Sequence, residues 1–127
     1  MKTIFRKLGI VSAVILSIGF AQSCKNKEPS VVKVFVRSAS NQVVEGAKVI
    51  IVGDVNSTPV TNSYVDTLIT NSSGFTQFNL APYYDAATEE QTVAYFDIIV
   101  TTNTKTAEGT VRSRVHTTAV ETVFLPL

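Results

Sequence analysis

From residue 31 onward the chain consists of short runs in which apolar and polar residues alternate, separated by turn residues. In the first run, Val32, Val34 and Val36 share one side of an extended chain, and two cations share the other. From Cys24 onward, 17 residues are Val and 15 are Thr, β-branched types that favour pleated surfaces over helices. An all-helical fold is therefore excluded.

Spacings of roughly 8 to 15 residues between such runs predict an all-β fold, a seven-stranded antiparallel β-sandwich. The expected strands are residues 31–37, 46–52, 64–70, 75–80, 93–101, about 110–116 and about 119–125. A polar turn is expected at 102–109. For the last two strands the sequence leaves two choices for the inward-facing residues. One set is Val111, Val115, Val123 and Leu125, and the other is Val120 and Phe124.

Strand alternation also predicts the core and the turns. Residues 71–74 predict a tight hairpin, because Gly74 can supply a positive φ. One short helical turn is expected at Ala86–Gln91, capped by Asp85. The expected core contains Val34, Ala47, Val49, Phe78, Phe96, Ile98 and Val100.

The N-terminus has the organisation of an export signal. Met1–Lys7 carries three positive charges, and Leu8–Phe20 is an apolar stretch of about 13 residues, too short to span a bilayer stably. Small residues at Ala21 and Ser23 then precede Cys24, the only cysteine. This arrangement resembles a bacterial lipobox and implies lipidation of Cys24.

The lipobox is a relaxed one. Ala21 stands where the family usually has Leu, and Gln22 where it usually has Ala or Ser. Such motifs resemble those of Bacteroidetes lipoproteins. An ordinary secretory signal, with Cys24 as a free thiol, and an uncleaved anchor are the alternatives.

Three segments follow from this interpretation: a signal peptide at 1–23, a lipidated Cys and polar tether at 24–30, and one domain at 31–127. At about 3.3 Å per residue, the six residues 25–30 reach about 20 Å. The charged residues directly after Cys24 resemble the short tags that direct some lipoproteins to the cell surface, although Glu28 is the only acidic residue among them. We therefore expect an outer-membrane protein, with the cell surface slightly favoured over the periplasmic face.

Four segments of the domain carry a family pattern: Gln42–Val49, Thr70–Phe78, Leu80–Pro82 and Tyr95–Val100. Together they resemble the carboxypeptidase regulatory-like, transthyretin-like β-sandwich over nearly all of residues 31–127. The resemblance implies two antiparallel sheets with Greek-key crossing, and its motifs serve turns and core without carrying an activity. A bacterial immunoglobulin-like domain is the near alternative.

The sequence offers little for catalysis or cofactors. His116 is the only imidazole, and no alternating run of Asp predicts calcium, so no metal, cofactor or enzyme activity is expected. The C-terminus also lacks the Tyr-Arg-Gly-Ser motif of transthyretin-like hydrolases. Without the signal, 8 basic residues face 10 acidic ones, a net charge of about −2, so no nucleic-acid partner is expected.

Two features remain as candidate sites. Tyr83 and Tyr84 form an exposed-looking aromatic pair that suits a binding loop, although a Tyr that caps the core is commoner. Asp66, Thr67 and Leu68 match a Bacteroidetes O-glycosylation sequon, which makes Thr67 the acceptor.

The sequence thus favours a membrane-anchored lipoprotein whose sandwich is a non-catalytic interaction module beside an envelope protein. A lipoprotein that binds a glycan or another small ligand through Tyr83 and Tyr84 is the alternative. If successive strands alternate in direction, the loops at 53–63 and 81–92 lie beside the tether, where they would face the membrane. The hairpin at 71–74 and the turn at 102–109 then lie at the far end.

Overall fold

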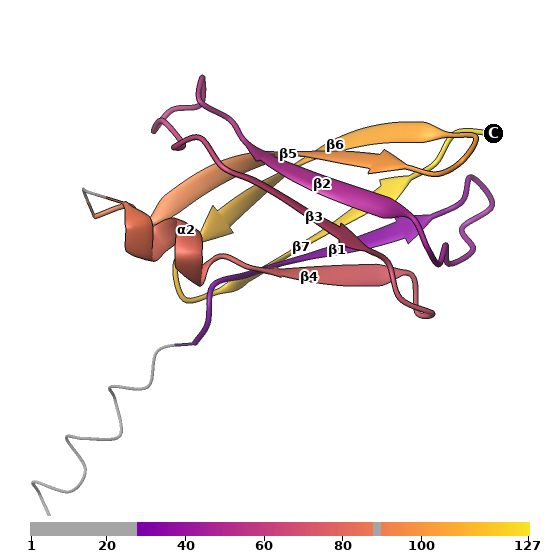
Figure 1. Ribbon diagram of the computed structural model, residues 1–127, viewed down its shortest axis with the longest axis horizontal. Coiled ribbons are helices and arrows are strands. Elements are labelled where there is room, and N and C mark those ends of the chain that lie inside the picture. The colour runs from indigo at the N-terminus through magenta and orange to yellow at the C-terminus, as the bar shows by residue number, and fades with distance from the viewer. Residues whose placement is uncertain (1–27, 88–89) are drawn as a thin grey trace, which may run out of the picture.

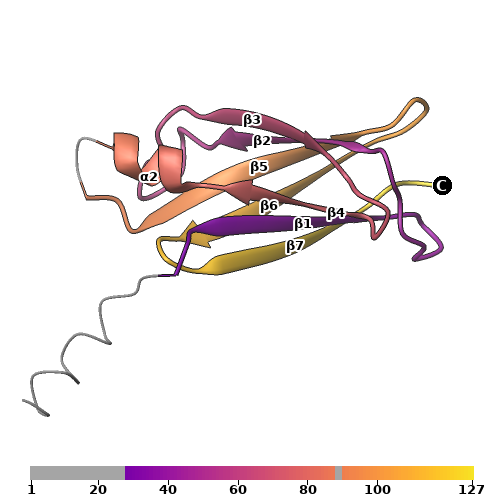
Figure 2. The same cartoon turned by 60° about the horizontal axis from the view of Figure 1, so that its bottom comes forward.

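The computed structural model describes residues 28–87 and 90–127, which form two packed β-sheets and one short helix (Figures 1 and 2). The predicted all-β class with two sheets is confirmed. The elements are β1 (Val31–Arg37), β2 (Lys48–Gly53), β3 (Val65–Ile69), β4 (Phe75–Asn79), α2 (Ala81–Ala86), β5 (Val93–Thr101), β6 (Thr106–Arg114) and β7 (Thr118–Phe124).

One sheet has the strand order β4-β1-β7 and the other the order β3-β2-β5-β6. All neighbouring strands are antiparallel except β1 and β7, which pair in parallel from Val31 with Thr118 to Arg37 with Phe124. The expectation of a wholly antiparallel sandwich is therefore wrong for this pair. The reason is that the turn at 115–117 returns the chain to the end where β1 begins, so the first and last strands run the same way.

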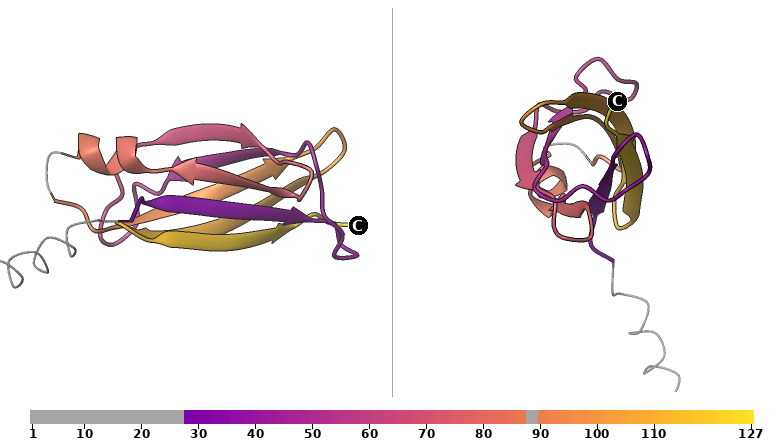
Figure 3. Two further views of the ribbon diagram at one scale, coloured as in Figure 1. Left: turned by 90° about the horizontal axis from the view of Figure 1, so that it is seen from below. Right: turned by 90° about the vertical axis from the view of Figure 1, so that its right-hand side faces the viewer.

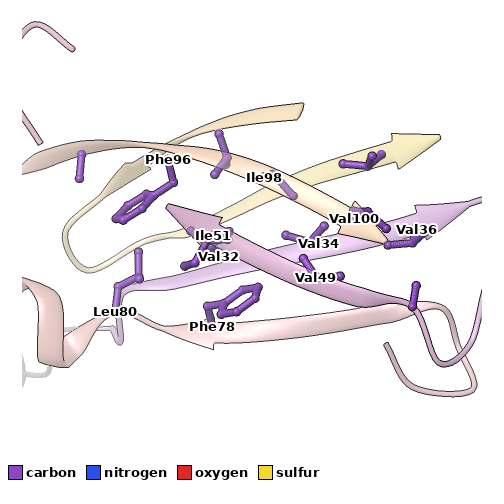
Figure 4. Close-up of a cluster of buried hydrophobic side chains, with 14 of the residues drawn as sticks. Val32, Val34, Val36, Val49, Ile51, Phe78, Leu80, Phe96, Ile98 and Val100 are labelled. Carbon is purple, nitrogen blue, oxygen red and sulfur yellow. The ribbon is translucent and has the colours of Figure 1, made fainter. Parts of the chain in front are cut away.

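The core lies between the two sheets and is almost entirely aliphatic and aromatic (Figure 4). Phe78 and Phe96 are its largest fully buried side chains. All seven core residues predicted from the sequence are buried, because six lie on the inward side of their strands and Ala47, directly before β2, continues the inward side of that strand. They are Val34, Ala47, Val49, Phe78, Phe96, Ile98 and Val100.

The last two strands differ from their expected bounds, and their burial shows which of their side chains face inward. β6 begins at Thr106, so the turn is shorter than the predicted 102–109. The prediction missed the start of β6 because its inward-facing residues Ala107 and Gly109 are too small to produce a hydrophobic alternation. The buried set is Val111, Val123 and Leu125, with Val115 only partly buried. Val120 and Phe124 are 56% and 55% exposed.

We call the end of the sandwich where β1 starts the entry end. There the Ser30 carbonyl accepts a hydrogen bond from the Leu80 N–H (2.8 Å), and the Ser30 Oγ accepts one from the His116 N–H (2.7 Å). The loop at 54–64, the described residues 80–87 and 90–92, and the turn at 115–117 therefore meet at this end (Figure 3). This is the placement that the count of strand directions predicts.

Candidate functional site

Tyr83 and Tyr84 lie on helix α2 at the entry end, not in an open loop. The helix covers Ala81–Ala86 instead of the expected turn at Ala86–Gln91. Pro82 suits the first turn, where an N–H is not needed, and the Asn79 Oδ1 accepts the Ala81 N–H at 3.0 Å. The Asp85 side chain is therefore not an N-cap.

The two rings pack into the end of the core. Tyr83 is 4% exposed and Tyr84 is partly buried against the core cluster. Tyr83 makes edge contacts with Tyr84, Tyr64 and Phe96, at centroid distances of 5.0, 5.5 and 5.3 Å. Of the two alternatives that the sequence offered, Tyr83 follows the core-capping one, because its buried ring closes the gap between the sheets. It is not an exposed ring.

Both phenol groups have polar partners, which makes their burial stable. The Tyr83 hydroxyl accepts the Asn62 N–H at 3.1 Å and donates to the Gln91 Oε1, while the Tyr84 hydroxyl donates to the Ser113 Oγ at 2.9 Å. Burial raises the pKa of both groups above the ordinary 10.0, and these hydrogen bonds partly oppose the shift. Both phenols therefore keep their protons at physiological pH.

The loop at 54–64 is held by its own side chains. The Ser57 hydroxyl donates to the Asp54 carbonyl at 2.7 Å and accepts the Thr61 N–H at 3.1 Å. The Thr61 Oγ1, which is fully buried, accepts the Tyr95 N–H of β5 at 2.8 Å. This hydrogen bonding anchors the loop to the four-stranded sheet, so the loop and helix α2 together form a structural lid at the entry end.

A cleft of about 480 Å³ lies beside this lid, between the start of the chain and the turn at 115–117. Tyr84, Glu28 and His116 are among its lining residues. The His116 Nδ1 lies 2.9 Å from the Glu28 carbonyl oxygen, and the backbone of His116 has a φ of 57°. Within residues 28–87 and 90–127, no group of three or more His, Cys, Asp or Glu side chains is arranged to hold a metal ion.

Thr67, the predicted glycosylation acceptor, lies on β3 at the edge of the four-stranded sheet and is exposed. Its backbone N–H is bonded to the Asp66 Oδ1 at 2.8 Å. Asp66 places a charge on this edge strand, and charged side chains on an edge strand discourage pairing with a strand of another molecule. The geometry leaves the Thr67 side chain accessible, and its glycosylation stays a prediction.

The outer side of the three-stranded sheet carries a surface that the sequence reasoning missed. We call it the phenylalanine face. By strand alternation it contains Val31, Lys33, Phe35 and Arg37 of β1, Phe75, Gln77 and Asn79 of β4, and Thr118, Val120, Thr122 and Phe124 of β7. The available signal was Phe35, which lies between the two cations already placed on the outer side of the first strand.

The centre of this face is a cross-strand pair. Phe35 and Phe75 oppose each other in the register of β1 and β4, with ring centroids 5.4 Å apart. The Lys33 ammonium lies 4.9 Å from the Phe35 centroid and 4.1 Å from the Phe75 centroid. Lys33 thus covers two partly exposed rings by a cation–π contact and keeps its charge at the surface.

Cys24 and the predicted signal peptide lie outside the described residues. In the portion that the structure does describe, no helix has the length and apolar character needed to cross a membrane. The sequence matches no protein-family model, and no curated protein is significantly similar to it.

Proposed function

We propose that this chain is a bacterial envelope lipoprotein, anchored through lipid on Cys24, whose β-sandwich is a non-catalytic interaction module. The observation that carries the proposal is the position of the only cysteine, directly between an apolar stretch and a polar tether. The tether is short, because β1 begins at Val31. Two or more acyl chains would hold such a protein stably at the membrane.

We further propose a transthyretin-like sandwich with Greek-key crossing for the domain. Support comes from the strand order β4-β1-β7, in which strands distant in the sequence are neighbours. The predicted hairpin at 71–74 is wrong, because β3 pairs with β2 and β4 pairs with β1, so the turn connects the two sheets. The turn does have the expected positive φ, 77° at Gly74. An added Cβ there would meet Val43 at 2.9 Å, so glycine is required for this turn as well as tolerated.

A non-catalytic role is supported by the entry end. The side chains gathered there bond mainly to one another and to the backbone, as the Tyr83, Tyr84 and Ser57 hydroxyls do. Glycan binding through Tyr83 loses its basis, since a buried ring offers no face for stacking on a sugar. An envelope protein beside the anchor is the partner we propose, at the outer membrane, with the cell surface slightly favoured over the periplasmic face.

Metabolic labelling of producing cells with a palmitate analogue tests the anchor. The wild-type chain should take up label and fractionate with membranes, and Cys24→Ser should do neither. Thr110→Ser is the control, because it introduces a serine on the exposed side of β6 and leaves Cys24 in place. This variant should take up as much label as the wild type. Equal labelling of wild type and Cys24→Ser, or a wild-type chain found only in the soluble fraction, would contradict the proposal.

A further inference from the structure

The phenylalanine face and the outer side of the four-stranded sheet differ in charge. Among the described strands, Lys33 and Arg37 are the only charged residues of the phenylalanine face. The outer side of the other sheet mixes both signs. It carries Lys48, Asp97, Glu108, Arg112 and Arg114. The charges of the phenylalanine face are therefore all positive, whereas the outer side of the other sheet carries both signs. Exposed apolar side chains occur on both outer sides, since Val65 and Ile69 of β3 are also exposed.

The apolar part of the phenylalanine face reaches solvent. Val120 and Phe124 of β7 are each more than half exposed, and Phe35 and Phe75 are partly exposed beneath Lys33. Rings and aliphatic side chains flanked by Lys and Arg are the combination that binds the interface of an anionic bilayer, where apolar groups enter and cations stay among the headgroups.

The start of the chain lies on the same side of the domain. In Figures 1 and 3 the first described residues, in indigo, leave β1 on the side of the three-stranded sheet, away from the four-stranded sheet. The Glu28 carbonyl and Ser30 are held there by His116 of the turn before β7. The first described residues therefore lie on the side of the domain that carries the phenylalanine face, and Cys24 precedes them in the sequence.

We propose that the phenylalanine face rests on the lipid surface that holds the anchor, with Phe124 and Val120 at the headgroup level and Lys33 and Arg37 against anionic headgroups. This inference rests on the proposed lipid anchor. A tether of about 20 Å allows the domain to lie on its side as readily as to stand on its entry end. Once the anchor is inserted, the face meets lipid at a high effective concentration.

The test uses the full lipidated chain reconstituted in vesicles of phosphatidylcholine, with or without phosphatidylglycerol. A photo-crosslinking residue replaces either Val120 on the phenylalanine face or Val65 on the outer side of β3. The two valines are a matched pair, because they are 56% and 63% exposed and lie on opposite sheets. We expect lipid adducts several-fold more frequent at position 120 than at 65, with the excess greatest in the anionic vesicles.

A charge comparison tests the role of the cations. With the crosslinker at 120, Lys33→Gln combined with Arg37→Gln should lower lipid adducts several-fold in anionic vesicles. Arg112→Gln combined with Arg114→Gln removes the same charge from the opposite side, where both residues are exposed, and should leave the adducts unchanged. Vesicle flotation of each variant reports the anchor separately.

The outcomes separate the two proposals. Chains that float but crosslink lipid equally at 65 and 120 overturn the docking face and leave the anchor standing. Protein dimers crosslinked at 120 in place of lipid adducts also overturn it, and assign the face to a second copy of the chain. A wild-type chain that does not float contradicts the anchor and, with it, the docking.

Discussion

The molecule has two aromatic clusters with opposite environments. At the entry end, Tyr64, Tyr83, Tyr84 and Phe96 pack edge to face inside the sandwich. On the phenylalanine face, Phe35, Phe75 and Phe124 lie at the surface. Three amphipathic tyrosines thus lie in the inner cluster, and three apolar phenylalanines lie in the outer one. The difference teaches that hydrogen-bond partners and strand register decide the location of a ring, and its side-chain type decides less.

The largest expected difference between the clusters is in stability. Phe96→Ala removes a ring that is 1% exposed and should lower the free energy of unfolding by about 3–5 kcal/mol. Phe124→Ala, from a ring that is 55% exposed, should change it by no more than about 0.5 kcal/mol. Urea denaturation measures both. Similar losses for the two variants would remove the distinction between the clusters.

The hydroxyl groups of the inner cluster come next. Tyr83→Phe keeps the buried ring but leaves the Asn62 N–H without its acceptor. The cost should be about 1–2 kcal/mol, because Asn62 is exposed and the hydrogen bond itself is only partly buried. Tyr95→Phe is the matched control, since that ring lies on the outer side of β5. Thermal unfolding of both variants measures the difference. A Tyr83→Phe protein as stable as the control would show that water replaces the lost hydrogen bond.

The outer cluster should show a smaller, pairwise energy. Phe35 and Phe75 form a cross-strand pair under Lys33, so a double-mutant cycle with alanine at both positions should give a coupling of about 0.5–1.5 kcal/mol. Phe35 with Phe124 serves as the comparison, because these residues are not opposite in the register. A coupling near zero for Phe35 and Phe75 would mean that the two rings pack independently.

The smallest expected effect is a dependence on alkaline pH that only the inner cluster produces. Burial raises the pKa of Tyr64, Tyr83 and Tyr84 above 10.0, and the Asp66 charge raises that of Tyr64 further. Because the folded state then holds these protons more tightly than the unfolded state, the stabilisation is complete below pH 10 and declines as the pH rises beyond it. Urea midpoints between about pH 9 and pH 11 should fall, and Tyr84→Phe should reduce the fall. A constant midpoint would contradict the burial of these phenols.

The sequence predicted most of the fold because period-two alternation is strong where large apolar residues face inward. Val32, Val34 and Val36 of β1 and Phe96, Ile98 and Val100 of β5 are the clearest cases. It failed where the inward residues are small, as at Ala107 and Gly109 of β6. The parallel pairing of β1 with β7 depends on which strands meet across the whole chain, and no local pattern contains that information.

For the candidate sites, sequence reasoning found the residues but not their surroundings. Tyr83 and Tyr84 drew attention as an adjacent pair, yet their partners Asn62 and Ser113 are distant in the sequence. The phenylalanine face was missed for the converse reason. Phe35, Phe75 and Phe124 come from three strands, and they meet only once the sheet order β4-β1-β7 is known.

The parallel pairing of β1 with β7 also determines how the domain would respond to mechanical force. The N-terminal end of β1 and the C-terminal end of β7 lie at opposite ends of the sandwich (Figure 1). Tension applied between them pulls the two strands lengthwise in opposite directions, which loads their whole ladder in shear. Its bonds must then break together, whereas a hairpin pulled from its open end unzips one bond at a time. A domain held by its N-terminus and pulled by a partner at its C-terminus would therefore resist extension, and its rupture would be governed by the rate of unfolding.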